Sequence, residues 1–220
     1  ALLFYGDLDL SIIDEMPVAR IPVNTYVVPN KKRADAYKFI EKKVKEGDSV
    51  YIITPLIEPS ETLLTVKAAK VEFEKLKLKV FPNLKLGLLH GRLKSKEKEQ
   101  AVSDFKDRKI DILVATSVVE VGMDVPNATI MVIEGADRFG LAQLHQLRGR
   151  VIRSTDQAYC FIFVTEKNRP SSAKATDGQG KTIARLKALK TAKNGFELAE
   201  LDLNLRGAGE LGGTKQWGIT

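Results

Sequence analysis

The 220-residue sequence contains one cysteine, Cys160, and only two histidines. A single cysteine cannot form a disulfide within the chain, and it excludes a zinc site built from several cysteines. Because Cys160 lies in the apolar run AYCFIFV, we interpret it as a small core residue in a reducing cytoplasm. The sequence has no run of about 18 apolar residues, so it predicts no membrane span. Its first ten residues carry two aspartates and no basic stretch, unlike a secretory signal.

The charge balance is basic, with 35 Lys and Arg against 28 Asp and Glu and a net charge of +7. A basic excess favours polyanionic partners, because contacts with phosphates release counterions. A lysine-rich protein without such a partner has the same composition, so charge alone leaves both interpretations open. Apolar residues make up 44% of the chain, which is enough for the core of one α/β domain with an appendage.

Short apolar runs alternate with amphipathic stretches from residue 23 onward. The predicted strands cover residues 23–28, 50–54, 86–89, 111–115, 129–134 and 158–164. The predicted helices cover residues 31–46, with Phe39 on the inner face, 61–79, 95–108, with Ser95 as N-cap, and 140–151. Near-continuous apolar strands are typical of a parallel sheet covered on both faces. The pattern therefore predicts a three-layer α/β domain with a mostly parallel sheet over residues 23–165.

The remaining segments have different patterns. Residues 1–22 begin in an apolar run with no turn before it, and we interpret them as the end of a connection from an upstream domain. Residues 166–180 are polar and lack periodicity, as in a flexible linker. Residues 181–192 and 194–205 predict two helices, followed by a glycine-rich tail.

Polar residues follow several of the predicted strands. They are Thr54, His90, Gly91, Thr116 and Glu134. Ligands of open parallel sheets bind beyond the carboxyl ends of the strands, where hydroxyls and glycine amides can approach phosphate oxygens. Polar residues also end strands in many proteins without binding anything there, so this clustering leaves both interpretations open.

The segment 140–151 carries the stronger signal. Its apolar side chains fall on one arc of a helix and are expected to face the core: Leu141, Leu144, Leu147 and Val151. If the helix runs one turn further, the opposite arc presents Gln146, Arg150 and Arg153. Arginine suits phosphate because its planar fork donates paired hydrogen bonds, although a solvated basic face has the same pattern.

Two residues upstream of this helix add to the signal. Gly122 permits close approach of the backbone to a ligand. Asp124 is placed to meet a ribose hydroxyl or to orient an arginine, or it is a turn residue before Pro126.

Several segments resemble known helicase motifs. ILVATSVVEVGMDVPNA resembles motif V of superfamily-2 helicases, and QLHQLRGRVIR resembles their motif VI. YGDLDLSIIDEMP, LLHGRLKSKEKE and EGADRFGLAQLHQLRGR resemble the RecG-type DNA helicases specifically. GFELAELDLNLRGAGELGGTKQWG is similar to the hairpin and loop that these enzymes share with the transcription-repair coupling translocases. Together the segments extend over nearly the whole chain.

The resemblance implies the second of two RecA-like lobes in an ATP-dependent DNA helicase of the bacterial cytoplasm. Residues 1–22 would then end the inter-lobe connection, and residues 181–220 would form a truncated hairpin and loop for translocation. The implied partners are branched DNA and the first lobe, in fork regression and Holliday junction migration during recombination and repair. ATP and Mg²⁺ would be bound mainly by the first lobe, because this sequence lacks G-x-x-x-x-G-K-[ST]. The isolated chain is therefore expected to be an inactive part of an ATP hydrolase.

Residue roles follow from the same resemblance. Arg150 and Arg153 resemble arginine fingers, which stabilise charge on a transferred phosphoryl group. The positions similar to nucleotide-binding residues are Gln146, Gly122 and Asp124. The positions similar to residues near the DNA backbone are Thr54, His90, Gly91 and Thr116, although a strand-end cap remains open for His90. The residues expected to couple the lobe to the hairpin are His145, Arg206 and Gln216, and no residue is assigned to a metal.

One position departs from the family pattern Gly-Arg-x-Gly-Arg, which reads Gly149-Arg150-Val151-Ile152-Arg153 here. The extra side chain of Ile152 narrows the backbone choices and crowds an approaching phosphate, so Arg150 is the firmer finger assignment. Two other interpretations stay open. They are a transcription-repair coupling translocase and a DNA-binding module that kept the lobe but lost catalysis.

Overall fold

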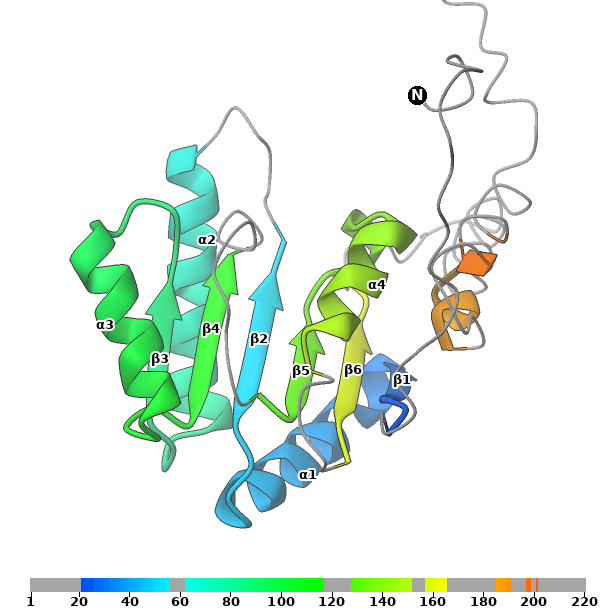
Figure 1. The fold of residues 1–220 in the computed structure, drawn as a ribbon, viewed down its shortest axis with the longest axis horizontal. Helices are drawn as coiled ribbons and strands as arrows, with labels where there is room; N and C mark the ends of the chain where they lie inside the picture. Colours follow the sequence, from blue (N-terminus) through cyan, green and yellow to red (C-terminus); the bar gives the residue numbers. More distant parts are fainter. Residues whose placement is uncertain are drawn as a thin grey trace, which may run out of the picture.

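The computed structural model describes residues 21–55, 62–116, 128–151, 157–165, 185–190, 197–198 and 201, with side chains of residues 62–68 excepted. Its centre is a six-stranded sheet in the order β1-β6-β5-β2-β4-β3 (Figure 1). The strands are β1 (Asn24–Val28), β2 (Val50–Thr54), β3 (Leu86–Leu89), β4 (Ile112–Thr116), β5 (Ile130–Ile133) and β6 (Tyr159–Phe163). Every pairing among them is parallel, which confirms the predicted fold class.

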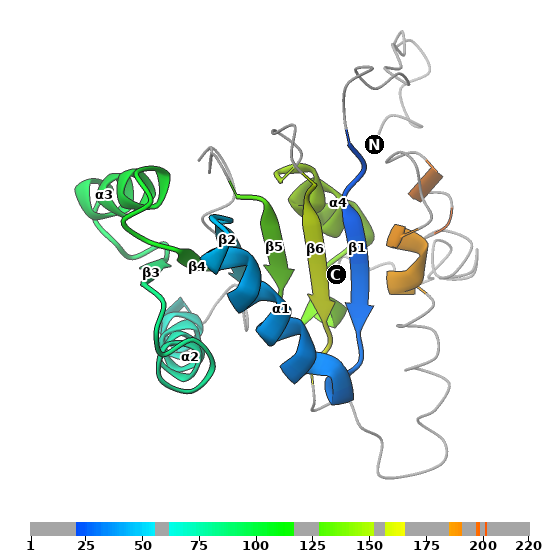
Figure 2. The same ribbon diagram turned by 90° about the horizontal axis from the view of Figure 1, so that it is seen from below.

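Helices cover both faces of the sheet, as the view from below shows (Figure 2). One face is covered by α1 (Arg33–Lys45), which follows the 3₁₀ turn η2 (Asn30–Lys32), and by α2 (Thr62–Lys75), which continues into the π-helical turn η3 (Leu76–Val80). The other face is covered by α3 (Ser95–Lys106) and α4 (Leu141–Gly149), the latter preceded by the 3₁₀ turn η5 (Ala136–Arg138). The helical residues 185–190 lie on this second face, because Leu186 and Leu189 belong to its core.

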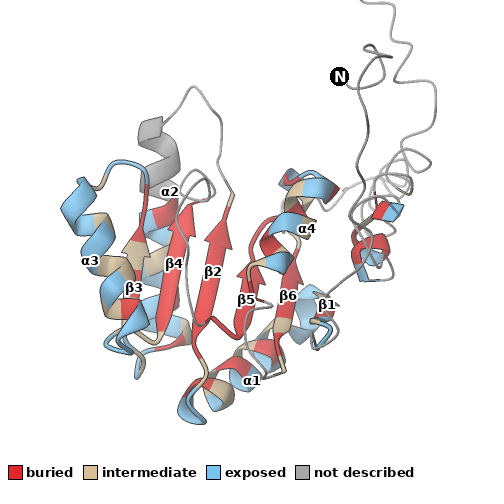
Figure 3. Ribbon diagram, viewed as in Figure 1, coloured by how far each residue is buried: buried red, intermediate tan, exposed pale blue. Residues whose placement is uncertain are grey.

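The central strand β2 explains why the strands read as continuous apolar runs. Tyr51 and Ile53 pack into the core under α3 and α4, whereas Val50 and Ile52 pack into the core under α1 and α2. Alternate residues of a strand point to opposite faces, so a sheet covered twice needs apolar residues at every position. All five residues of β2 are buried, and the burial colours in Figure 3 show the same for β4 and β5.

Three details differ from the predictions. The N-cap of α3 is Lys94 and not Ser95, and the backbone N–H of Lys94 donates to Glu97 Oε2 at 2.8 Å. Phe39, expected on the inner face of α1, is 36% exposed and packs edge-to-face against Tyr159. Helix α4 ends at Gly149 with Arg150 as its C-cap, so it does not extend to residue 151.

Cys160 is fully buried in the core, as expected, and its burial raises the pKa of the thiol to about 12. Within the described residues, no helix combines the length and apolar character that crossing a bilayer requires. Residues 1–20, the predicted linker 166–180 and most of the predicted hairpin lie outside the described residues.

The turn after β5 depends on a glycine, which makes a stability test possible. Gly135 adopts φ +57°, and a Cβ atom there would lie 2.8 Å from Cγ of Pro55. A side chain in this left-handed conformation is strained, so Gly135→Ala is expected to lower the free energy of unfolding by about 1–3 kcal/mol. Chemical denaturation followed by circular dichroism measures this change.

Gly149→Ala is the matched control, because nothing lies within 4 Å of a Cβ at this helical glycine. Alanine favours a helix over glycine by about 1 kcal/mol, so this variant should unfold at the same or a slightly higher denaturant concentration. Equal losses in the two variants would contradict the strained-turn interpretation.

Candidate functional site

The carboxyl edge of the sheet brings three of the predicted residues together. Thr54 ends β2, Thr116 ends the neighbouring β4, and the Cα atoms of these two threonines are register partners. His90 follows β3, whose last residue, Leu89, is in register with Ala115 of β4. The ends of three adjacent strands therefore carry Thr54, Thr116 and His90 side by side, with Gly91 next in the chain.

These residues are more buried than a simple surface contact requires. Thr54, His90 and Thr116 are 5%, 6% and 1% exposed, whereas Gly91 is exposed. The hydroxyl of Thr54 donates to the carbonyl oxygen of Ala115 at 3.2 Å, which ties β2 to β4 at the edge. His90 Nδ1 is buried and has no hydrogen-bond partner among the described residues. Burial together with the nearby charge of Lys70 lowers the pKa of His90. The carboxyl edge of the sheet thus combines the exposed residue Gly91 with the buried, neutral imidazole of His90.

Helix α4 has the two-sided character that its sequence predicts. Leu141, Leu144 and Leu147 are buried, and so is Val151 just beyond the helix. Gln146 is exposed, and Arg150 is half-buried at the C-cap, where its N–H donates to the Leu147 carbonyl oxygen at 3.0 Å. Because Arg150 keeps helical dihedrals, it lies one turn beyond Gln146 on the same side of the helix. The helical backbone therefore places the side-chain amide of Gln146 and the guanidinium of Arg150 one turn apart on the same side of α4.

A second arginine of α4 points to a different neighbour. Arg148 donates to the Leu189 carbonyl oxygen and lies 3.0 Å from Nδ1 of His145. Burial and the charge of Arg148 lower the pKa of His145, so the neutral ring predominates at pH 7 and its Nδ1 accepts the hydrogen bond. In the opposite direction, Arg185 donates to the Phe139 carbonyl oxygen at 2.9 Å. Arg148 of α4 thus binds a carbonyl of residues 185–190, and Arg185 binds a carbonyl of the turn before α4. These two contacts hold residues 185–190 against α4 and that turn.

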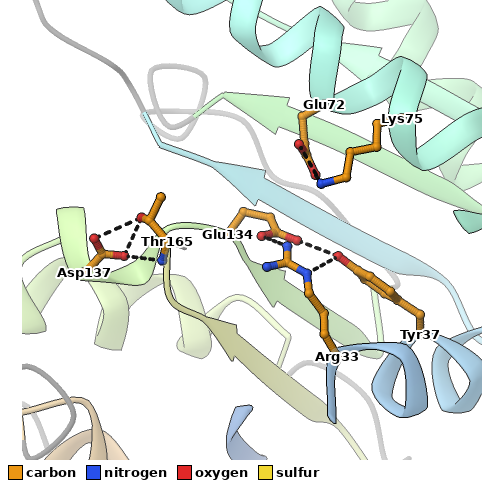
Figure 4. A network of polar contacts seen from close by, with 7 residues as sticks. All are labelled: Arg33, Tyr37, Glu72, Lys75, Glu134, Asp137 and Thr165. Carbon is orange, nitrogen blue, oxygen red and sulfur yellow. Dashed lines mark hydrogen bonds and ion pairs between the residues drawn. The ribbon is translucent and has the colours of Figure 1, made fainter. Parts of the chain in front are cut away.

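The turn between β5 and α4 is fixed by carboxylates. Asp137 of η5 accepts hydrogen bonds from the N–H and the hydroxyl of Thr165, just after β6, at 2.8 and 2.7 Å. Glu134 is paired with Arg33 and accepts a hydrogen bond from the Tyr37 hydroxyl at 3.0 Å (Figure 4). Burial raises the pKa of Glu134, and the charge of Arg33 opposes that rise. Burial would lower the pKa of Arg33, but Glu134 and Tyr37 outweigh it and raise this pKa, so the guanidinium stays charged.

Sequence reasoning missed the structural roles of Arg33, Tyr37, Arg148 and Arg185. Only Arg148 offered a local signal, because it lies three residues after His145 on one helix. Arg33 and Glu134 are separated by 101 residues, and no periodicity connects them.

Several predicted site residues lie outside the described residues. They are Gly122, Asp124, Arg153, Arg206 and Gln216, and the divergent Ile152 lies outside them as well. In the part of the chain that is described, no three His, Cys, Asp or Glu side chains gather closely enough to hold a metal ion.

Comparison with known proteins identifies the class to which this lobe belongs. The profile of the helicase conserved C-terminal domain matches residues 31–155, more than half of the chain. Domain 2 of the DEAD-box helicase Mss116p, solved with an RNA duplex, superposes with a TM-score of 0.51 at 24% identity over 77% of this chain and 59% of that one. That likeness supports the fold alone. The chain belongs to the helicase conserved C-terminal domain family.

Within that class, the particular resemblance is to RecG. The chain is 49% identical to the ATP-dependent DNA helicase RecG of Synechocystis sp. and 46% identical to that of Thermotoga maritima, over its whole length. It spans 25% and 27% of those proteins. A structure of RecG bound to a three-way DNA junction superposes with a TM-score of 0.69 at 44% identity, covering 96% of this chain and 26% of that one. The RecG-type resemblance predicted from the motifs is confirmed.

The contact between α4 and residues 185–190 can be tested by removing one arginine. Arg148→Met loses the hydrogen bonds to Leu189 and His145 but keeps an apolar side chain of similar length. A lost hydrogen bond from a charged group costs about 1.5–3 kcal/mol, so amides of residues 185–190 should exchange with deuterium roughly ten- to a hundredfold faster. Hydrogen exchange with mass spectrometry measures this rate.

Arg108→Met is the control, because Arg108 is an exposed arginine that also donates to a carbonyl oxygen, that of Gly47. It should leave exchange in residues 185–190 unchanged. Unchanged exchange in Arg148→Met as well would show that apolar packing alone holds this segment.

Proposed function

We propose that this chain is the second motor lobe of an ATP-dependent DNA helicase that acts on branched DNA, as in fork regression and Holliday junction migration. The proposal takes its substrate from the RecG relatives, which are DNA helicases by name, one of them solved on a three-way junction. The basic balance of +7 suits a DNA partner. The relatives are about three to four times as long as the chain, so the other lobe and the junction-reading parts lie in the remainder of such a protein.

The observation that carries the proposal is the arrangement of α4. Its leucines are buried in the core, and Gln146 and Arg150 lie one turn apart on the opposite side. Guanidinium and amide N–H groups are suitable donors for phosphate oxygens, so these residues fit a nucleotide triphosphate held between two lobes. ATP, with Mg²⁺, supplies the phosphoryl bond whose hydrolysis drives such a motor. Arg150 would stabilise the charge that develops there, with Gln146, Gly122, Asp124 and Arg153 beside it.

The strand ends supply the DNA contact in this proposal. The exposed Gly91 amide and the buried His90 imidazole would face a backbone phosphate, with Thr54 and Thr116 holding adjacent strand ends in place. The hairpin residues Arg206 and Gln216 would pass the motion to DNA. His145 and Arg148 would link them to α4 through residues 185–190.

The first test uses the chain alone. Since the sequence lacks G-x-x-x-x-G-K-[ST], the purified 220-residue chain should release no phosphate from ATP above the buffer rate, with or without a three-way DNA junction. Circular dichroism confirms that the sample is folded, and a full-length helicase of this family serves as the positive control. Substantial DNA-stimulated turnover by the chain alone would overturn the split-site proposal.

The second test addresses Arg150 in the full-length protein that carries this lobe. An arginine finger contributes about 10³–10⁵ in rate, so Arg150→Ala should lower kcat by orders of magnitude while junction binding in gel-shift assays changes little. Arg150→Lys keeps the charge but loses the planar fork, and should recover only a small part of the activity. Arg108→Ala, which removes a positive charge at the amino edge of the sheet, is the control. Normal turnover by Arg150→Ala would remove the arginine-finger assignment, whereas a full-length protein without DNA-stimulated turnover would favour the alternative of a DNA-binding module.

A further inference from the structure

The side chain of Glu134 is held by two polar groups of α1. Its Oε2 pairs with Arg33, and its Oε1 accepts from the Tyr37 hydroxyl at 3.0 Å. Arg33 Nε also donates to Tyr37 Oη at 2.8 Å, so the three polar groups form a closed triangle. The Arg33 guanidinium lies 4.4 Å from the centre of the Phe163 ring at the end of β6. The Glu134 carboxylate, one residue after β5, is therefore held by α1, which is itself packed on β6.

The surroundings of this triangle are apolar. Glu134 is 7% exposed, and the Tyr37 ring packs against Phe81 and Phe163 with centroids 5.5 and 5.4 Å apart. One further charged group lies near the triangle. The negative charge of Glu72 on α2 raises the pKa of Glu134, and Glu72 itself pairs with Lys75 at 3.2 Å (Figure 4). Desolvation of a buried ion pair costs about as much as the attraction returns, so an apolar set of similar volume is often as stable. Stability alone therefore does not explain why charges occupy this place.

The chain path suggests another role. The N–H of Glu134 donates to the Ile53 carbonyl oxygen at 2.9 Å, and Gly135 then turns in the left-handed conformation toward the opposite face. Asp137 binds Thr165 on the way, and α4 begins at Leu141. The short connection from β5 to α4 is thus held at two points. Glu134 binds Arg33 and Tyr37 of α1, and Asp137 binds Thr165 just after β6. Directional hydrogen bonds at both points define where α4 starts.

We propose that Arg33 and Glu134, with Tyr37, are positioning residues that align the β5–α4 connection and so set the place of Arg150. This inference rests on the proposed function, because it assigns the triangle a role in the reaction through α4. Apolar contacts can slide, whereas a closed set of hydrogen bonds has one geometry. Misplacing a catalytic group by about 1 Å can lower a rate by about a hundredfold.

The experiment separates stability from position in the full-length protein. Three variants are compared: Glu134→Gln, Arg33→Met, and the triple variant Arg33→Met with Tyr37→Phe and Glu134→Leu. Glu134→Gln leaves the Arg33 guanidinium without its counter-charge, and Arg33→Met leaves the buried Glu134 without its cation, so both Tm and kcat should fall. The triple variant leaves no unpaired polar group and should recover the wild-type Tm, while kcat stays about ten- to a hundredfold low and KM for ATP changes little.

The exposed ion pair Glu41–Lys45 on α1, with N and O atoms 2.9 Å apart, supplies the control. The double variant Glu41→Met with Lys45→Met should keep wild-type kcat. Wild-type kcat in a stable triple variant would overturn the inference, and so would a triple variant as unstable as the singles, which would make the triangle structural. The Arg150→Ala result keeps the two proposals apart. If Arg150→Ala loses turnover and the triple variant does not, only the positioning role fails.

Discussion

A parallel sheet buried on both faces is the constraint on which the rest of this domain depends. Its strands run in the same direction, so their carboxyl ends meet at one edge, and whatever follows them is gathered there. β2 is central because it pairs with both β4 and β5. That pairing places Thr54 beside Thr116 and carries Glu134 one step past β5, with its N–H on the Ile53 carbonyl oxygen. The strand ends that carry Thr54 and Thr116 and the turn into α4 are therefore positioned by the same strand, β2.

Arginine performs different tasks in this domain. Arg33 holds a buried carboxylate, and Arg148 and Arg185 hold backbone carbonyls across the contact between α4 and residues 185–190. A planar guanidinium with several donors is suited to all of these. These three arginines hold parts of the structure together, and a fourth, Arg150, occupies the C-cap of α4, one turn beyond the exposed Gln146.

The connection between β5 and α4 concentrates these requirements in a short segment. The Glu134 side chain pairs with Arg33 on the face covered by α1. Gly135 then adopts a left-handed conformation, and Asp137 binds Thr165. The Phe139 carbonyl oxygen then receives Arg185 from the following helical segment. A displacement of residues 185–190 would thus act on both ends of this region, through Arg185 on the turn and through Arg148 on α4. Short directional bonds make such a linkage stiff.

The sequence by itself determined the secondary structure and the fold class. Burial on both faces requires continuous apolar strands, and one buried helix face requires the spacing of Leu141, Leu144 and Leu147, so both can be read locally. It also pointed to Thr54, His90 and Thr116 at the strand ends, because the parallel topology places them there, and to Arg150 by its helical spacing from Gln146. Phe39 and Ser95 were misjudged, since exposure at a sheet margin and the choice of an N-cap depend on neighbours.

Only the tertiary structure decided that Arg33, Tyr37 and Glu134 form one network and that Arg148 meets Leu189. These partners are up to 101 residues apart, and a polar side chain carries no periodic signal for a distant partner. Their pairing arises when the sheet order β6-β5-β2 sets the distance between α1 and the end of β5.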